Sequence, residues 1–177
     1  MNPAPNTIAL FLYTNGLDYV EEKTKLAVDE LDRTAAECGV FAHDVMICGS
    51  SLGAYPAMHA AIYCKEDFGI TVPCVLSLDA GSDWQETEYT LSREECLKTA
   101  QLGTQFYLFE SPFVGMDRAP IREMVLTGND VTIVGCVYDQ HERISFDALG
   151  MGVIDWALGD RSEPYVSDIY SFNRLAP

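Results

Sequence analysis

The stretch that decides the fold is residues 45–54, VMICGSSLGA, an apolar run followed by a turn of small residues. The apolar run predicts a buried strand, and the residues after the turn predict a helix over about 52–64. Gly49, Ser51 and Gly53 match G-x-S-x-G, in which the serine occupies a sharp strand-to-helix turn. The glycines lack a Cβ, so the backbones can pass closely there. The stretch therefore predicts a nucleophilic Ser51; the alternative is an ordinary strand–turn–helix corner.

On both sides of this stretch, apolar runs alternate with amphipathic ones, which is typical of a parallel sheet covered by helices. Strands are expected at residues 8–13, 45–48, 72–78, 105–109 and 131–137. Helices are expected at residues 19–38, 52–64, 93–102, 119–126 and 146–158, with Ser92 and Ser145 as N-caps. The pattern predicts the α/β class, with a mostly parallel five-stranded sheet in a three-layer α/β/α arrangement. We expect one domain over residues 1–177, with a core at about 8–158 and a tail at 161–177.

Composition narrows the classes of partner. The 177 residues include 11 basic and 27 acidic ones, a net charge of −16, which argues against binding nucleic acid or an anionic membrane. No apolar run is long enough for a transmembrane helix, and the N-terminus does not resemble a signal peptide, so a cytoplasmic protein is expected. The six cysteines form no C-x-x-C pair and are expected to be reduced and buried. No metal-ligand spacing is present, and no cofactor is expected.

A serine nucleophile needs a base of near-neutral pKa, and histidine supplies one. A parallel sheet collects its functional loops at the carboxyl ends of the strands. Of the three histidines, His43 precedes the second strand and His59 lies inside a helix, whereas His141 directly follows a strand. His141 is therefore the predicted base, with a surface capping histidine as the alternative.

The third member of such a site is a carboxylate that orients the imidazole. Asp117, in the loop after the fourth strand, is the first choice. Glu110, at the end of that strand, is the second, and Asp79 is the third. Each of them has the alternative of being a solvated surface carboxylate. Asn15 follows the first strand and is expected at the same edge of the sheet.

Three groups of residues together resemble the α/β-hydrolase superfamily, in particular its small serine esterases, thioesterases and acyl hydrolases. They are Gly49-Ser50-Ser51-Leu52-Gly53, then Asp117-Arg118-Ala119-Pro120, then His141, in the family's order of nucleophile, acid and histidine. The resemblance implies hydrolysis of a small ester or thioester through an acyl-enzyme on Ser51. The backbone N–H of Leu52 would bind the oxyanion. If residues 8–13 form the strand next to the nucleophile strand, Asn15 lies where a second donor belongs; if they form the next strand out, that donor is absent.

The chain is shorter than this family at its N-terminus. The family usually has several strands before the nucleophile strand, and only residues 8–13 are available here. One sheet edge would then be open unless the tail or a second copy of the chain covers it. A non-catalytic hydrolase-like interaction protein is the first alternative. A flavodoxin-like or Rossmann-like binding module is the second, although G-x-G-x-x-G and a Walker lysine are absent.

Overall fold

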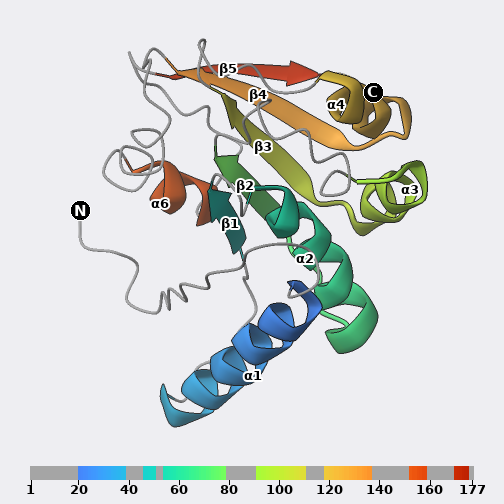
Figure 1. The fold of residues 1–177 in the computed structure, drawn as a ribbon. Coiled ribbons are helices and arrows are strands. Elements are labelled where there is room, and N and C mark those ends of the chain that lie inside the picture. The colour runs from blue at the N-terminus through green and yellow to red at the C-terminus, as the bar shows by residue number, and fades with distance from the viewer. Residues whose placement is uncertain are drawn as a thin grey trace.

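The computed structural model describes residues 20–38, 46–50, 54–78, 91–110, 118–136, 152–158 and 170–175 and shows an α/β architecture (Figure 1). Its strands pair in the order β1-β2-β3-β4-β5. The strands are β1 (Met46–Ser50), β2 (Cys74–Leu78), β3 (Gln105–Glu110), β4 (Asp130–Cys136) and β5 (Tyr170–Leu175). The helices are α1 (Val20–Cys38), α2 (Ala54–Phe68), α3 (Arg93–Leu102), α4 (Arg118–Leu126) and α6 (Val153–Leu158).

The sheet is mostly parallel, as the alternation of apolar and amphipathic runs predicts. Strands β1 to β4 pair in parallel, and β5 pairs with β4 in the antiparallel direction. The connections through α2, α3 and α4 each move one strand further in the same direction. Because crossover connections between parallel strands are almost always right-handed, connections that move in one direction place successive helices on one face of the sheet.

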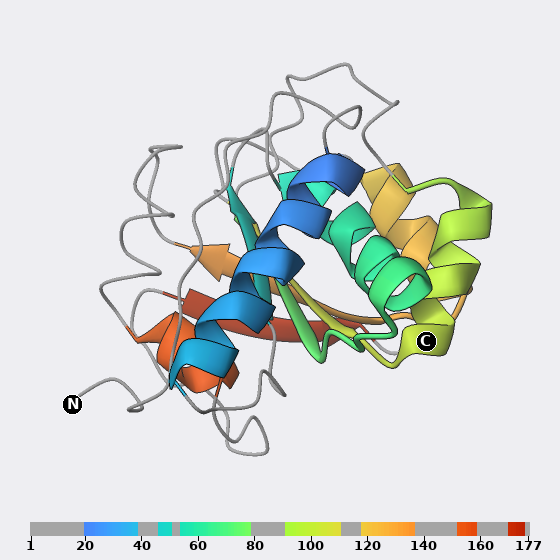
Figure 2. The same cartoon turned by 90° about the horizontal axis from the view of Figure 1, so that it is seen from below.

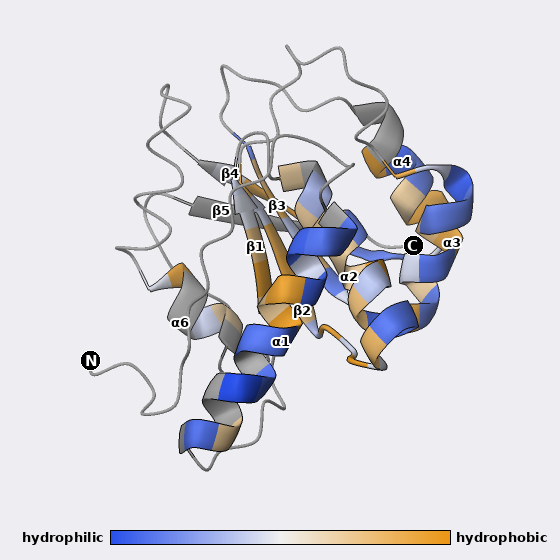
Figure 3. Cartoon of the chain, turned by 60° about the horizontal axis from the view of Figure 1, so that its bottom comes forward, coloured by the Kyte–Doolittle hydropathy of each residue, from blue (hydrophilic) through white to orange (hydrophobic). Residues whose placement is uncertain are grey.

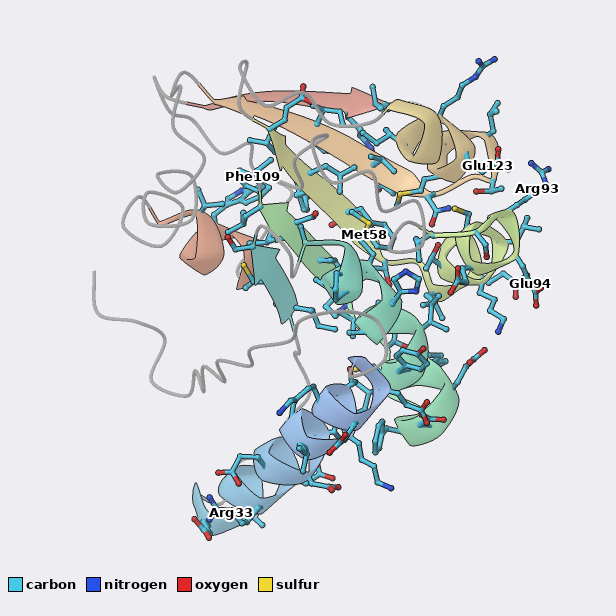
Figure 4. All side chains as sticks on the ribbon, viewed as in Figure 1. Arg33, Met58, Arg93, Glu94, Phe109 and Glu123 are labelled. Carbon is cyan, nitrogen blue, oxygen red and sulfur yellow. The ribbon has the colours of Figure 1, made fainter. Side chains whose placement is uncertain are left out.

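Apolar side chains cover both faces of the sheet, which explains why every residue of β2 is buried. Val75, Phe106 and Leu108 belong to a cluster with residues of α1, α2, α3 and α4. The alternate residues of the same strands form a second cluster with Val153 and Ala157 of α6. Figures 1 and 2 show these helices on their respective sides of the sheet, and Figure 3 shows the hydrophobic colour along the strands. In Figure 4, Met58 of the first cluster and Phe109 of the second lie on opposite sides of the sheet.

Helix α2 runs one turn beyond the expected end at residue 64. Gly69 ends it with φ +69°, a left-handed conformation that glycine adopts without steric cost. The Gly69 N–H donates to Lys65 O at 3.1 Å, and the Ile70 N–H donates to Cys64 O at 3.0 Å. The first is the bond of an αL-type helix end, and the two bonds together satisfy the carbonyls of Lys65 and Cys64.

One prediction for the C-terminal region is corrected, and one element there was not predicted. The prediction of a continuous helix over 146–158 is wrong, because Gly152 has φ +77° and the described helix begins only at Val153. Residues 145–150, with the expected N-cap Ser145, lie outside the described part of the chain. The tail contains a strand that the sequence did not predict, β5, which covers the outer edge of β4. The expected first strand, residues 8–13, also lies outside the described residues.

Among the described helices, none is long and apolar enough to cross a membrane. The cysteines Cys64, Cys74 and Cys96 are buried and free, as expected, whereas Cys48 is free but exposed. Burial raises the pKa of the Cys64 thiol to about 11, so this thiol stays protonated at neutral pH.

Candidate functional site

The carboxyl ends of four parallel strands lie at one edge of the sheet. Ser50, the last residue of β1, is in register with Leu78, the last residue of β2. Leu78 is in register with Phe109 of β3, and Phe109 with Val134 of β4. The loops that continue from β1, β2, β3 and β4 therefore all start from this edge, as the site prediction requires.

The connection after β1 is short. Strand β1 ends at Ser50 and α2 begins at Ala54, so only residues 51–53 lie between a strand and a helix. Ala54 is completely buried at the start of α2, and Pro56 lies in its first turn, where no backbone N–H is needed. Gly49 is buried in β1 itself. A strand, a three-residue connection and a helix are the local arrangement that a nucleophile turn needs.

Most of the predicted site residues lie outside the described part of the chain. They are Ser51, Leu52, Asn15, Asp79, Asp117 and His141. Their positions along the chain relative to described elements are nevertheless known. Asp117 directly precedes Arg118, the first residue of α4, and His141 is five residues beyond Cys136, the last residue of β4.

Glu110 is the one predicted site residue that the structure describes. It is the last residue of β3 and is half-buried, with its Oε2 atom inside the protein. Strand alternation places it on the face of Phe106 and Leu108, which is the face covered by α2, α3 and α4. Glu110 is therefore at the expected edge of the sheet, on the face that α2, α3 and α4 cover.

His59 has a partner that sequence reasoning missed. It is buried in α2, and its Nδ1 lies 3.0 Å from Oε1 of Glu95 in α3. The second oxygen of Glu95 accepts the backbone N–H of Ser92 at 2.8 Å, as part of the capping box at the start of α3. Although burial opposes ionisation of Glu95, the bonds from Ser92 and the contact with His59 lower its pKa. His59 thus joins two helices, and no local pattern links residues 36 positions apart.

A buried serine at this edge, Ser77 of β2, was also not singled out by the sequence. It is completely buried and pairs in register with Gly49. Within the described residues, no group of three His, Cys, Asp or Glu side chains is arranged to hold a metal ion.

Comparison with known proteins finds no family model that matches the chain and no curated protein with significant similarity to it.

Proposed function

We propose that the protein is a serine hydrolase that cleaves a small ester or thioester through an acyl-enzyme on Ser51. The observation that carries the proposal is the shared carboxyl edge of β1 to β4, with three residues between β1 and α2. G-x-S-x-G falls across this connection. In this proposal His141 is the base and Asp117 orients it.

The strand order leaves Ser51 and His141 close enough to meet. Strands β1 and β4 are separated by three strand spacings, or about 14 Å at the usual spacing of about 4.8 Å. The five residues from Cys136 to His141 can span up to about 16 Å when extended. Asp117 follows β3, the direct neighbour of β4, so only one strand spacing separates the starts of its loop and the His141 loop.

The proposed reaction has two halves. The Ser51 oxygen attacks the substrate carbonyl while His141 takes the hydroxyl proton, and the Leu52 N–H stabilises the oxyanion, with Asn15 beside it as a second donor. The bond to the alcohol or thiol breaks as His141 returns that proton to the leaving group. Water then attacks the acyl-Ser51 ester by the same route, which releases the acid and restores the serine.

We also propose an architecture for the whole chain. It is a single-domain, minimal hydrolase-like fold with three α/β/α layers, in which residues 8–13 form a strand beside β1. The packing of α6 against the face opposite α2, α3 and α4 supports three layers. A cytoplasmic location is proposed as well. If residues 8–13 do not cover β1, a second copy of the chain would be needed at that edge.

The strand order also bears on the binding-module alternative. Doubly wound sheets bind ligands where the strand order reverses, at a topological switch point. Strands β1 to β4 follow chain order without a reversal, so no such point lies between them. This favours a hydrolase over a flavodoxin-like or Rossmann-like module.

A serine-directed fluorophosphonate probe tests the proposal. We expect it to label the folded wild-type chain and not Ser51→Ala, because only a hydroxyl activated by a base reacts readily with such probes. His141→Gln should also lose labelling. Absence of labelling in the folded wild-type chain would contradict the hydrolase and favour the non-catalytic alternative.

The same probe identifies the acid. We expect Asp117→Asn to reduce the labelling rate by a factor of about 10³ or more, because the imidazole loses its orienting charge. Glu110→Gln and Asp79→Asn should reduce it much less. Loss of labelling in Glu110→Gln alone would assign the role to Glu110 instead. Esters of graded acyl length then define the substrate.

A further inference from the structure

The face of the sheet that α2, α3 and α4 cover changes in character at its carboxyl end. Its other residues are apolar and belong to the core cluster with these helices or pack against it; they are Ile47, Val75, Phe106, Leu108, Val131 and Ile133. Strand alternation makes Gly49, Ser77, Glu110 and Gly135 the last residues that β1, β2, β3 and β4 place on this face. Ser77 and Glu110 are therefore the only polar side chains that these four described strands place there.

Ser77 buries its hydroxyl without a described partner. The residue is completely buried, and its Oγ atom has no hydrogen-bond partner among the residues that the structure describes. Burying a hydroxyl in this way costs free energy, so such a group in a native protein points to a bound molecule. Its neighbours in register, Gly49 and Leu108, offer no polar side chain.

Glu110 is the polar side chain that shares this face with Ser77. Ser77 is in register with Leu108, and Glu110 follows Leu108 by two residues on the same face of β3. With strands about 4.8 Å apart and a rise of about 3.3 Å per residue, the Cα atoms of Ser77 and Glu110 are about 8 Å apart. The Oε2 atom of Glu110 lies inside the protein. A carboxylate can accept about four hydrogen bonds, so Glu110 can accept a further donor beside its other contacts.

We propose that Ser77 and Glu110 bind one ordered water molecule between them, on the face covered by α2, α3 and α4. The two side chains do not bond to each other directly, and a water about 2.8 Å from each group spans about 5.6 Å. The water donates one hydrogen to the Glu110 carboxylate and pairs with the Ser77 hydroxyl, which gives it the polar partners that a buried water needs. Gly49 beside Ser77 and Gly135 beside Glu110 have no side chains, which leaves space at this end of the face.

A double-mutant cycle in the full chain tests the shared water, with unfolding in urea as the readout. Ser77→Ala removes one partner of the water, and Glu110→Met removes the other while it keeps the length of the side chain. We expect Ser77→Ala to raise the equilibrium constant for unfolding about fivefold in the wild-type background and not to raise it in the Glu110→Met background. Equal effects of Ser77→Ala in the two backgrounds would overturn the inference.

Thr104→Val is the matched control for the cycle. Thr104 is another buried hydroxyl, but it lies just before β3, at the opposite end of the sheet, and donates to Val72 O at 2.7 Å. Its loss should raise the equilibrium constant for unfolding by the same factor with and without Glu110→Met, because distant sites act independently.

A high-resolution crystal structure of the wild-type chain identifies the bound molecule and decides the question even if a variant fails to fold. We expect a water oxygen within about 3.2 Å of both Ser77 Oγ and a carboxylate oxygen of Glu110. A direct bond between the two side chains, or a Ser77 hydroxyl with no water beside it, would overturn the inference. Neither experiment depends on whether Ser51 reacts, so the inference and the proposed function stand or fall separately.

Discussion

At the scale of single residues, Asn129 makes the densest set of buried hydrogen bonds in the described protein. Its Nδ2 donates to Cys96 O at 2.8 Å and to Met124 O at 3.0 Å, and its Oδ1 lies 2.7 Å from the Thr99 hydroxyl. One side chain thus joins α3 to the end of α4, directly before β4. We expect Asn129→Asp to lower the free energy of unfolding at neutral pH by about 3 kcal/mol, since a carboxylate would face two carbonyl oxygens. Urea denaturation measures the change.

Variants of the facing threonine control for this prediction. Thr99→Ser keeps the hydroxyl near Asn129 Oδ1 and should cost little, whereas Thr99→Val removes it and should cost about 1–2 kcal/mol. If the Asn129→Asp variant is as stable as the wild type, the hydrogen bonds of Asn129 are absent in solution.

At the scale of elements, α3 begins with a reciprocal capping box. Ser92 Oγ accepts the Glu95 N–H at 3.3 Å, and Glu95 Oε2 accepts the Ser92 N–H at 2.8 Å. In the folded protein the pKa of Glu95 is lowered from its ordinary value of 4.5. The ionised carboxylate therefore stabilises the fold fully above pH 4.5, and this contribution is lost as the pH falls through the pKa of the folded protein. We expect Glu95→Gln to be about 1 kcal/mol less stable than wild type at pH 7. The difference should shrink towards pH 3.

Thermal unfolding of both chains across this pH range checks the prediction. Glu94→Gln is the matched control, because Glu94 is the exposed neighbour in the same turn and has no part in the capping box. A difference for Glu95→Gln that stays constant down to pH 3 would show that its charge does not matter.

Elements with a strong local signal could be predicted from the sequence. The parallel strands are continuous apolar runs because both their faces are buried, and the Ser92 cap has a side chain suited to its position. The strand β5 was missed because its alternation of Tyr170 and Phe172 with polar residues is short. Gly152 was read as part of a helix because a single glycine does not reveal a left-handed backbone.

At the scale of the whole molecule, the sequence supplied the candidate residues and the expectation of one shared carboxyl edge, but not the order of the strands that form it. Ser51 and His141 could be chosen by residue type and by their positions after strands. That β1 and β4 run in parallel three spacings apart depends on long-range pairing, which no local pattern encodes. The pairing of Ser77 with Gly49 has the same origin, and for this reason the serine passes unnoticed in the sequence.

The strand β5 closes one side of this sheet, and its removal gives the last prediction. It pairs with β4 from Val131 to Cys136, and Arg174 makes two bonds to Asp130, at 2.9 and 2.6 Å. We expect a chain ending at residue 169 to melt at least about 6 °C lower, equivalent to about 2 kcal/mol, since the β4 ladder loses its partner. It should also associate with rising concentration, because an uncovered strand edge can pair with another chain. Differential scanning calorimetry and sedimentation velocity measure the two effects.

Arg174→Ala is the control for this truncation. It should lower the free energy of unfolding by less than about 1 kcal/mol, because the ion pair with Asp130 is exposed, and it should leave the chain monodisperse. A truncated chain that keeps both the melting temperature and the sedimentation coefficient expected for its size would show that β4 does not need this cover.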